Sequence, residues 1–86
     1  MTREDQIRKE LLFQLYALRP LTLDPDRIER DARKNGYDYA RAEIQRELVF
    51  LADEGLLIKI SEPGTTCVRY RIHAHGVRHY EEIYAA

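Results

Sequence analysis

The sequence has little of several features that mark common protein classes. It holds one cysteine and no tryptophan, and neither charge is in surplus, because 14 basic residues stand against 15 acidic ones. One cysteine cannot form an internal disulfide, which favours a reducing compartment. The formal net charge of −1 counts against nucleic-acid binding, since such proteins usually carry surplus positive charge.

Long apolar segments are also missing. No apolar run approaches the roughly 20 residues that cross a bilayer, and the N-terminal residues lack a signal-peptide pattern. We therefore expect a cytoplasmic protein with no membrane partner. Hydrophobic residues nevertheless make up 44% of the 86 residues, which excludes a disordered chain and suits a single domain, residues 1–86.

No group of residues indicates catalysis or a bound cofactor. The sequence has neither a glycine-rich phosphate loop nor a nucleophile elbow, and its one serine, Ser61, falls in a predicted turn. Carboxylates alternate with basic neighbours at helical spacing, as they do on solvated faces. We therefore expect a protein that is not an enzyme and has no cofactor.

Apolar spacing and helix-terminating residues predict three helices in the first two thirds of the chain. Asp24 followed by Pro25 is typical of a helix start, and Asn35-Gly36 of a helix end. Asp38 is a candidate N-cap for the third helix, and Gly55 is its candidate C′ residue. The predicted helices span residues 4–18, 25–34 and 39–54.

The remaining third of the chain predicts a hairpin and a last helix. Residues 56–60 are rich in strand formers, and Pro63-Gly64 marks a turn. Residues 68–72 alternate apolar residues with Arg69 and Arg71, so one face of this strand should be buried. Residues 74–84 return to helical spacing, and the fold class predicted is α+β.

This order of elements, with Leu51-Ala52-Asp53-Glu54-Gly55-Leu56-Leu57 at its centre, resembles the winged helix-turn-helix superfamily. The link Leu21-Thr22-Leu23-Asp24 and the segment from Tyr70 to Gly76 are similar to family segments, although His73 stands where Thr is usual. The resemblance implies three helices, a two-stranded wing hairpin and a C-terminal helix. It also implies a small bacterial or phage transcriptional regulator that binds double-stranded DNA sequence-specifically.

If the resemblance holds, the third helix reads the major groove. Its candidate contacts are the residues left outside the apolar stripe of Ile44, Leu48 and Leu51. Basic residues of the second helix and the second hairpin strand would hold phosphates. The full candidate set is Tyr39, Arg41, Ala42, Gln45, Arg46, Arg27, Arg30, Lys34, Arg69 and Arg71.

The alternative is a winged helix that binds another protein and does not bind DNA directly. Between residues 37 and 60, three basic residues stand against five acidic ones. Among the acidic residues, Glu43 and Glu47 flank Gln45. A locally acidic reading helix would weaken attraction to phosphates, so an adaptor function stays open.

Histidines near the C-terminus raise a metal-binding hypothesis, since some repressors of this superfamily sense metals. His75 and His79 share a helix face, and His73 and Cys67 precede them. Four ligands are not clearly placed, however, and Cys67 falls on the outward strand face. We expect exposed helix residues, with His73 as a cap, and no metal.

The first and last predicted helices carry more apolar residues than one small core can absorb. Leu12, Phe13, Ile83 and Tyr84 are therefore candidates for the interface of a homodimer. The alternative is that the C-terminal helix packs on the first helix within one chain.

Overall fold

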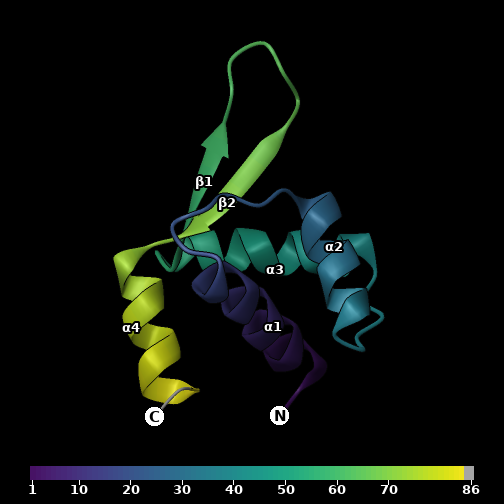
Figure 1. The fold of residues 1–86 in the computed structure, drawn as a ribbon, viewed down its shortest axis with the longest axis vertical. Helices are drawn as coiled ribbons and strands as arrows, with labels where there is room; N and C mark the ends of the chain where they lie inside the picture. The colour runs from purple at the N-terminus through teal and green to yellow at the C-terminus, as the bar shows by residue number, and fades with distance from the viewer. Residues whose placement is uncertain (85–86) are drawn as a thin grey trace.

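The computed structural model describes residues 1–84 and shows an α+β fold with helices and a two-stranded antiparallel hairpin (Figure 1). Residues 85–86 of the predicted domain lie outside the described residues. No described helix combines the length and apolar character needed to cross a membrane. The elements are α1 (Arg3–Ala17), α2 (Pro25–Lys34), α3 (Arg41–Asp53), β1 (Leu57–Ser61), β2 (Val68–Ile72) and α4 (Ala74–Ile83).

Most helix boundaries lie where local capping chemistry predicts them. The Asp24 side chain caps α2 by accepting a hydrogen bond from the Arg27 N–H at 2.8 Å. Gly36 and Gly55 follow the ends of α2 and α3 with φ of +91° and +79°, which L side chains rarely adopt. The second helix is therefore confirmed from end to end.

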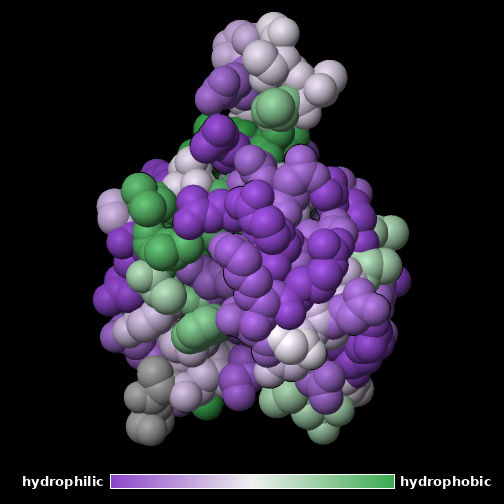
Figure 2. Space-filling model, turned by 45° about the vertical axis from the view of Figure 1, so that its right-hand side comes forward, coloured by the Kyte–Doolittle hydropathy of each residue, from purple (hydrophilic) through white to green (hydrophobic). Residues whose placement is uncertain are grey.

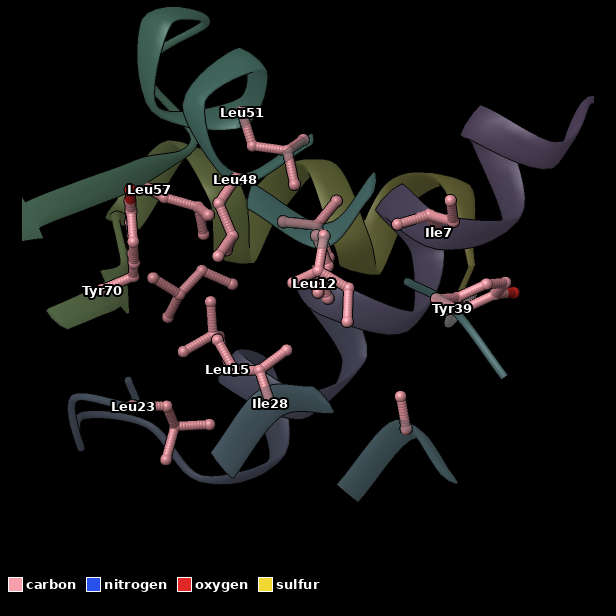
Figure 3. Packing of buried hydrophobic residues seen from close by; sticks show 14 residues of the cluster. Ile7, Leu12, Leu15, Leu23, Ile28, Tyr39, Leu48, Leu51, Leu57 and Tyr70 are labelled. Atoms are coloured by element: carbon pink, nitrogen blue, oxygen red, sulfur yellow. The ribbon is translucent and has the colours of Figure 1, made fainter. Parts of the chain in front are cut away.

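The predicted start of the third helix is wrong. The N-cap is Ala40, in extended conformation, rather than Asp38, and Tyr39 lies before the helix and is only 5% exposed. The Tyr39 ring lies near Ile7 in the core (Figure 3). Because the ring is buried there, the helix begins only at Arg41. Glu43 then accepts a hydrogen bond from the Ala40 N–H at 3.1 Å and provides half of a capping box.

The core forms around α1, which contacts the other three helices and β2 (Figure 3). Leu11 and Leu15 of α1 are completely buried, as are Ile44 and Leu48 of α3. The apolar stripe predicted for the third helix therefore does face the core. Burial of one such side chain contributes roughly 1.5–3 kcal/mol of transfer free energy.

The hairpin pairs Leu57 with Ile72 and Ser61 with Val68, and its turn projects beyond the helices (Figure 1). Leu23, predicted only as part of an extended link, exchanges two backbone hydrogen bonds with Tyr70, at 2.8 and 2.9 Å. This bridge attaches the chain just before α2 directly to β2. The start of α2 and the base of the hairpin are therefore held together.

Gly76 allows α4 to approach the hairpin closely. A Cβ atom there would overlap the carbonyl oxygen of Leu56 and come within 2.8 Å of Ile72 Cγ1. One turn earlier, His73 caps α4, since its Nδ1 accepts a hydrogen bond from the His75 N–H at 3.0 Å. The predicted histidine cap is confirmed, and Gly76 has a packing reason that helix propensity alone does not reveal.

Candidate nucleic-acid interface

The outward face of α3 is the first part of the candidate interface. Ala42, Gln45, Arg46 and Val49 are exposed and follow one another at helical spacing. The opposite side of the helix packs against α1 and α2. Three of the predicted contact residues on this helix, Ala42, Gln45 and Arg46, therefore share one solvent-facing surface.

The Glu43 carboxylate of α3 is engaged by α1 rather than presented outward. The Arg3 guanidinium donates to it through Nε at 2.6 Å and through Nη2 at 3.0 Å. This pairing, with a hydrogen bond from the Ala40 N–H, lowers the pKa of Glu43 to about 2. Glu43 is therefore ionised at neutral pH, and Arg3 balances its charge.

Glu47 lies deeper, with 2% of its side chain exposed. Arg8 of α1 donates to it at 2.7 Å, and Arg46 donates to its other oxygen at 3.0 Å. The Arg8 guanidinium also lies 3.8 Å from the centroid of the Phe50 ring. The two central acids of the third helix are thus compensated from the α1 side.

Arg41 and Tyr39 are not free to contact bases as predicted. The Arg41 guanidinium donates to Glu29 at 2.5 Å and also pairs with Asp26, both on α2. These carboxylates raise the pKa of Arg41. Arg41 therefore ties α3 to α2, while the core takes up Tyr39, whose burial raises the pKa of its hydroxyl.

The basic residues predicted on α2 lie at the surface. Arg27 forms an ion pair with Asp31 at 3.5 Å, whereas Arg30 and Lys34 form none within residues 1–84. Figure 2 brings this side of the molecule forward and shows a largely hydrophilic face below the projecting hairpin turn. Arg30 and Lys34 are the cations of this helix best placed to hold phosphates.

Arg69 and Arg71 lie on the hairpin face that turns away from the core. Their cross-strand partners are Ile60 and Ile58, so this face alternates basic and apolar side chains. Arg69 is exposed and Arg71 is half-buried. Neither arginine forms an ion pair within the described part of the chain, so both can meet an anion.

His73 and His75 contact each other at the start of α4. The ring centroids of His73 and His75 lie 4.6 Å apart, and His73 caps α4. Across residues 1–84, no three His, Cys, Asp or Glu side chains gather as a metal site requires. Cys67 is exposed but lies just before β2 rather than on the strand as predicted.

The four residues predicted at a dimer interface do not form one surface. Leu12 is 1% exposed and belongs to the core of the single chain. Leu12 also lines a groove with Ile83 and Tyr84, whereas Phe13 lines a separate pocket with Asn35 and Tyr37.

Within one chain, α4 packs on α1, as the alternative prediction has it. The rings of Tyr16 and Tyr80 stack with their centroids 4.5 Å apart. The Tyr16 hydroxyl also donates to Glu81 at 3.0 Å. These contacts join α4 to α1, while Phe13 and Ile83 remain exposed.

The sequence offered no local signal for Arg3 and Arg8. Each lies about forty residues from the acid that it neutralises, in an ordinary amphipathic helix. Only the packing of α1 against α3 identifies them as the groups that set the charge of the candidate interface.

No model of a known protein family matches the chain, and no curated protein matches its sequence. What the chain does must therefore be inferred from its own residues.

Proposed function

We propose that this chain is a winged helix-turn-helix protein that binds double-stranded DNA sequence-specifically and acts as a small bacterial or phage transcriptional regulator. The order of elements and the projecting hairpin support this fold (Figure 1). The Leu23–Tyr70 bridge supports it further, because it fixes the start of α2 to the hairpin. The pair of helices α2 and α3 and the hairpin would then bind a duplex as one rigid unit.

The observation that carries the proposal is the inward pairing of the acids of α3. Glu43 and Glu47 are neutralised by Arg3 and Arg8, so they do not present unbalanced charge to a duplex. The outward stripe carries one cation, Arg46, and ends at the exposed Asp53. Two of the five acids that opposed DNA binding at the level of sequence are therefore paired with α1 and do not face a duplex unbalanced.

The outward residues of α3 have the chemistry that major-groove reading uses. The Nε of Arg46 donates to Glu47, and its two terminal nitrogens can still donate to guanine, because the side chain is 62% exposed. Gln45 can pair with adenine in a bidentate manner. Ala42 and Val49 offer methyl groups that suit the methyl group of thymine. Arg30 and Lys34 on α2, with Arg69 and Arg71 on the hairpin, would hold phosphates and set the register.

A protein partner at the same face is the alternative function. Val49 and Phe50 are both exposed on α3, and apolar residues of this size are typical of protein interfaces. In that case the chain would be an adaptor that uses the scaffold without touching DNA. Salt dependence separates the two, since phosphate contacts weaken steeply as salt rises.

The test begins with a selection from a random duplex pool, which should enrich one sequence. Fluorescence anisotropy with that labelled duplex at low salt then compares Arg46→Ala with the wild type. We expect Arg46→Ala to weaken binding by about 1–3 kcal/mol, the range of one good base contact. Arg78→Ala is the matched control, because it removes the same charge from an exposed position on α4.

Three results would contradict the proposal. One is the absence of duplex binding at low salt. Another is equal weakening by Arg46→Ala and Arg78→Ala, which would mean only non-specific attraction. The third is affinity that does not change with salt, which would favour a protein partner for the same face.

A further inference from the structure

An open pocket of about 480 Å³ lies beside α1, away from the outward face of α3 and from the hairpin. Its wall includes Lys9, Glu10 and Phe13 of α1, Asn35 and Tyr37 after α2, and Tyr80 of α4. Three of these six side chains are aromatic, and one is a carboxylate. The proposed DNA surface uses none of them.

Glu10 is unusual because its carboxylate is buried without a cation. The residue is 6% exposed, and it forms no ion pair within residues 1–84. Its Oε2 accepts hydrogen bonds from the amides of Gln14 and Asn35, each at 2.8 Å. Buried charges in proteins are normally paired, so two neutral donors leave this carboxylate undercompensated.

Two oxygen atoms on this side of α1 accept no hydrogen bond from residues 1–84. Glu10 Oε1 accepts no hydrogen bond from the described residues, and Gln14 Oε1 is buried and also without a partner. Gln14 lines a smaller adjoining pocket that shares Phe13 and Asn35 with the first. Gln14 Oε1 is fully buried, so the acceptor that a ligand in the pocket can reach is Glu10 Oε1. An N–H donor would satisfy this oxygen, and a positive charge would balance the carboxylate.

The aromatic wall suits the same ligand. Phe13 is 42% exposed and Tyr37 is 43% exposed, so both rings are accessible from the pocket side of α1. Faces of aromatic rings attract organic cations. Lys9 does not supply the missing charge, because its Nζ lies 5.4 Å from the centroid of the Tyr84 ring.

We propose that this pocket binds an organic cation, an alkylammonium or guanidinium group that donates to Glu10 Oε1 and lies against Phe13 and Tyr37. The cation is either a free small amine or the side chain of a lysine or arginine on a partner. The proposal does not depend on DNA binding, because the two surfaces share no residue.

The test is an NMR titration of the ¹⁵N-labelled chain with n-butylammonium or methylguanidinium at constant ionic strength. We expect saturable shifts of the backbone amides around Glu10 and Tyr37 and of the Asn35 side-chain amide. 1-Butanol, which has the same alkyl chain without the charge, should give no such shifts. The absence of saturable shifts with either cation would overturn the proposal.

Three variants locate the site. Glu10→Gln keeps the shape and the acceptor oxygen, and it should weaken cation binding about tenfold or more, the value of a charge-assisted hydrogen bond. Phe13→Ala should also weaken binding, whereas Phe50→Ala, at an exposed aromatic of another groove, should not. Lys9→Ala should strengthen binding, because it removes a like charge.

The variants remain decisive even where one of them fails to fold. Phe13 and Lys9 are exposed, so their variants report on the pocket if Glu10→Gln is unstable. Equal affinity of the wild type and Glu10→Gln would refute the carboxylate role. If Glu10→Gln does not fold, equal affinity of the wild type, Phe13→Ala and Lys9→Ala would refute the pocket.

The source of the cation is decided by the tripeptides acetyl-Gly-Lys-Gly-amide and acetyl-Gly-Arg-Gly-amide. Binding of either peptide as tight as that of the free cation identifies a partner side chain. Exclusion of both peptides while n-butylammonium or methylguanidinium still binds identifies a free small molecule.

Discussion

Replacing Arg8 by methionine tests the charge arrangement between α1 and α3. Methionine keeps most of the apolar stem of the arginine but removes the guanidinium that pairs with Glu47 at 2.7 Å. Glu47 is 2% exposed and would keep only Arg46, whose side chain is 62% exposed. The variant thus leaves a buried carboxylate with one weakly held cation.

The expected cost follows from the burial of that pair. Breaking a fully buried ion pair costs about 3–5 kcal/mol, but Arg46 and solvent near Arg8 reduce this, so we expect about 2–3 kcal/mol. Loss of the guanidinium from the Phe50 ring adds about 0.5–1 kcal/mol at a partly exposed site. For a domain of this size, each kcal/mol lowers the melting temperature by roughly 4–8 °C.

Adding a second substitution should reverse part of the loss. In Arg8→Met/Glu47→Leu, no charge is left buried, and an apolar pair can replace an ion pair at little or no cost. The double variant should therefore be more stable than Arg8→Met alone. If the loss of each charged side chain simply destabilised the fold further, the double variant would instead be less stable than Arg8→Met.

Urea unfolding followed by circular dichroism at 222 nm measures these differences, provided that the m-value stays constant. Arg78→Met, at an exposed position on α4, is the control and should change stability by less than about 0.5 kcal/mol. The reasoning is refuted if Arg8→Met costs no more than this control. It is equally refuted if the double variant is the least stable of the set.

Two further predictions concern the helix junction and the pH dependence. Gly76→Ala should lower the free energy of unfolding by about 1–3 kcal/mol, measured by thermal denaturation. The clash with Leu56 should outweigh the roughly 1 kcal/mol by which alanine stabilises a helix relative to glycine. Unchanged or higher stability would contradict this close approach. Since the folded-state pKa of Glu43 is depressed to about 2, the stability from its pairing with Arg3 should be present above the ordinary carboxyl pKa and lost as pH falls toward 2. In Arg3→Gln, the NMR titration midpoint of the Glu43 carboxyl should rise toward 4.5, and an unchanged midpoint would show that Arg3 is not the cause.

The parts of the fold that were predicted correctly depend on local chemistry. Asp24-Pro25 and Asn35-Gly36 bound α2 because capping and the left-handed glycine involve only neighbouring residues. The alternation of residues 68–72 predicted which strand face is buried for the same reason. Of the candidate site, this local information correctly placed Gln45 and Arg46 at the surface of α3.

The features that were missed depend on contacts between distant segments. Tyr39 continues the helical pattern in sequence, but the core takes up its ring and delays the start of α3. The bridge between Leu23 and Tyr70 joins residues far apart in the chain, and nothing near Leu23 indicates it. The pairing of Arg41 with α2 likewise depends on how α2 and α3 pack, which residue spacing does not fix.

The central claim, that α3 and the hairpin form a duplex-binding surface, is tested most directly by NMR mapping. A short duplex, preferably one enriched by selection, is added to the ¹⁵N-labelled chain at low salt, and shifted amides are placed on the structure. We predict shifts at Ala42, Gln45, Arg46 and Val49 and along residues 68–72, with α4 unaffected. Shifts confined to α4, or no shifts at a duplex concentration in excess of the protein, would contradict the claim.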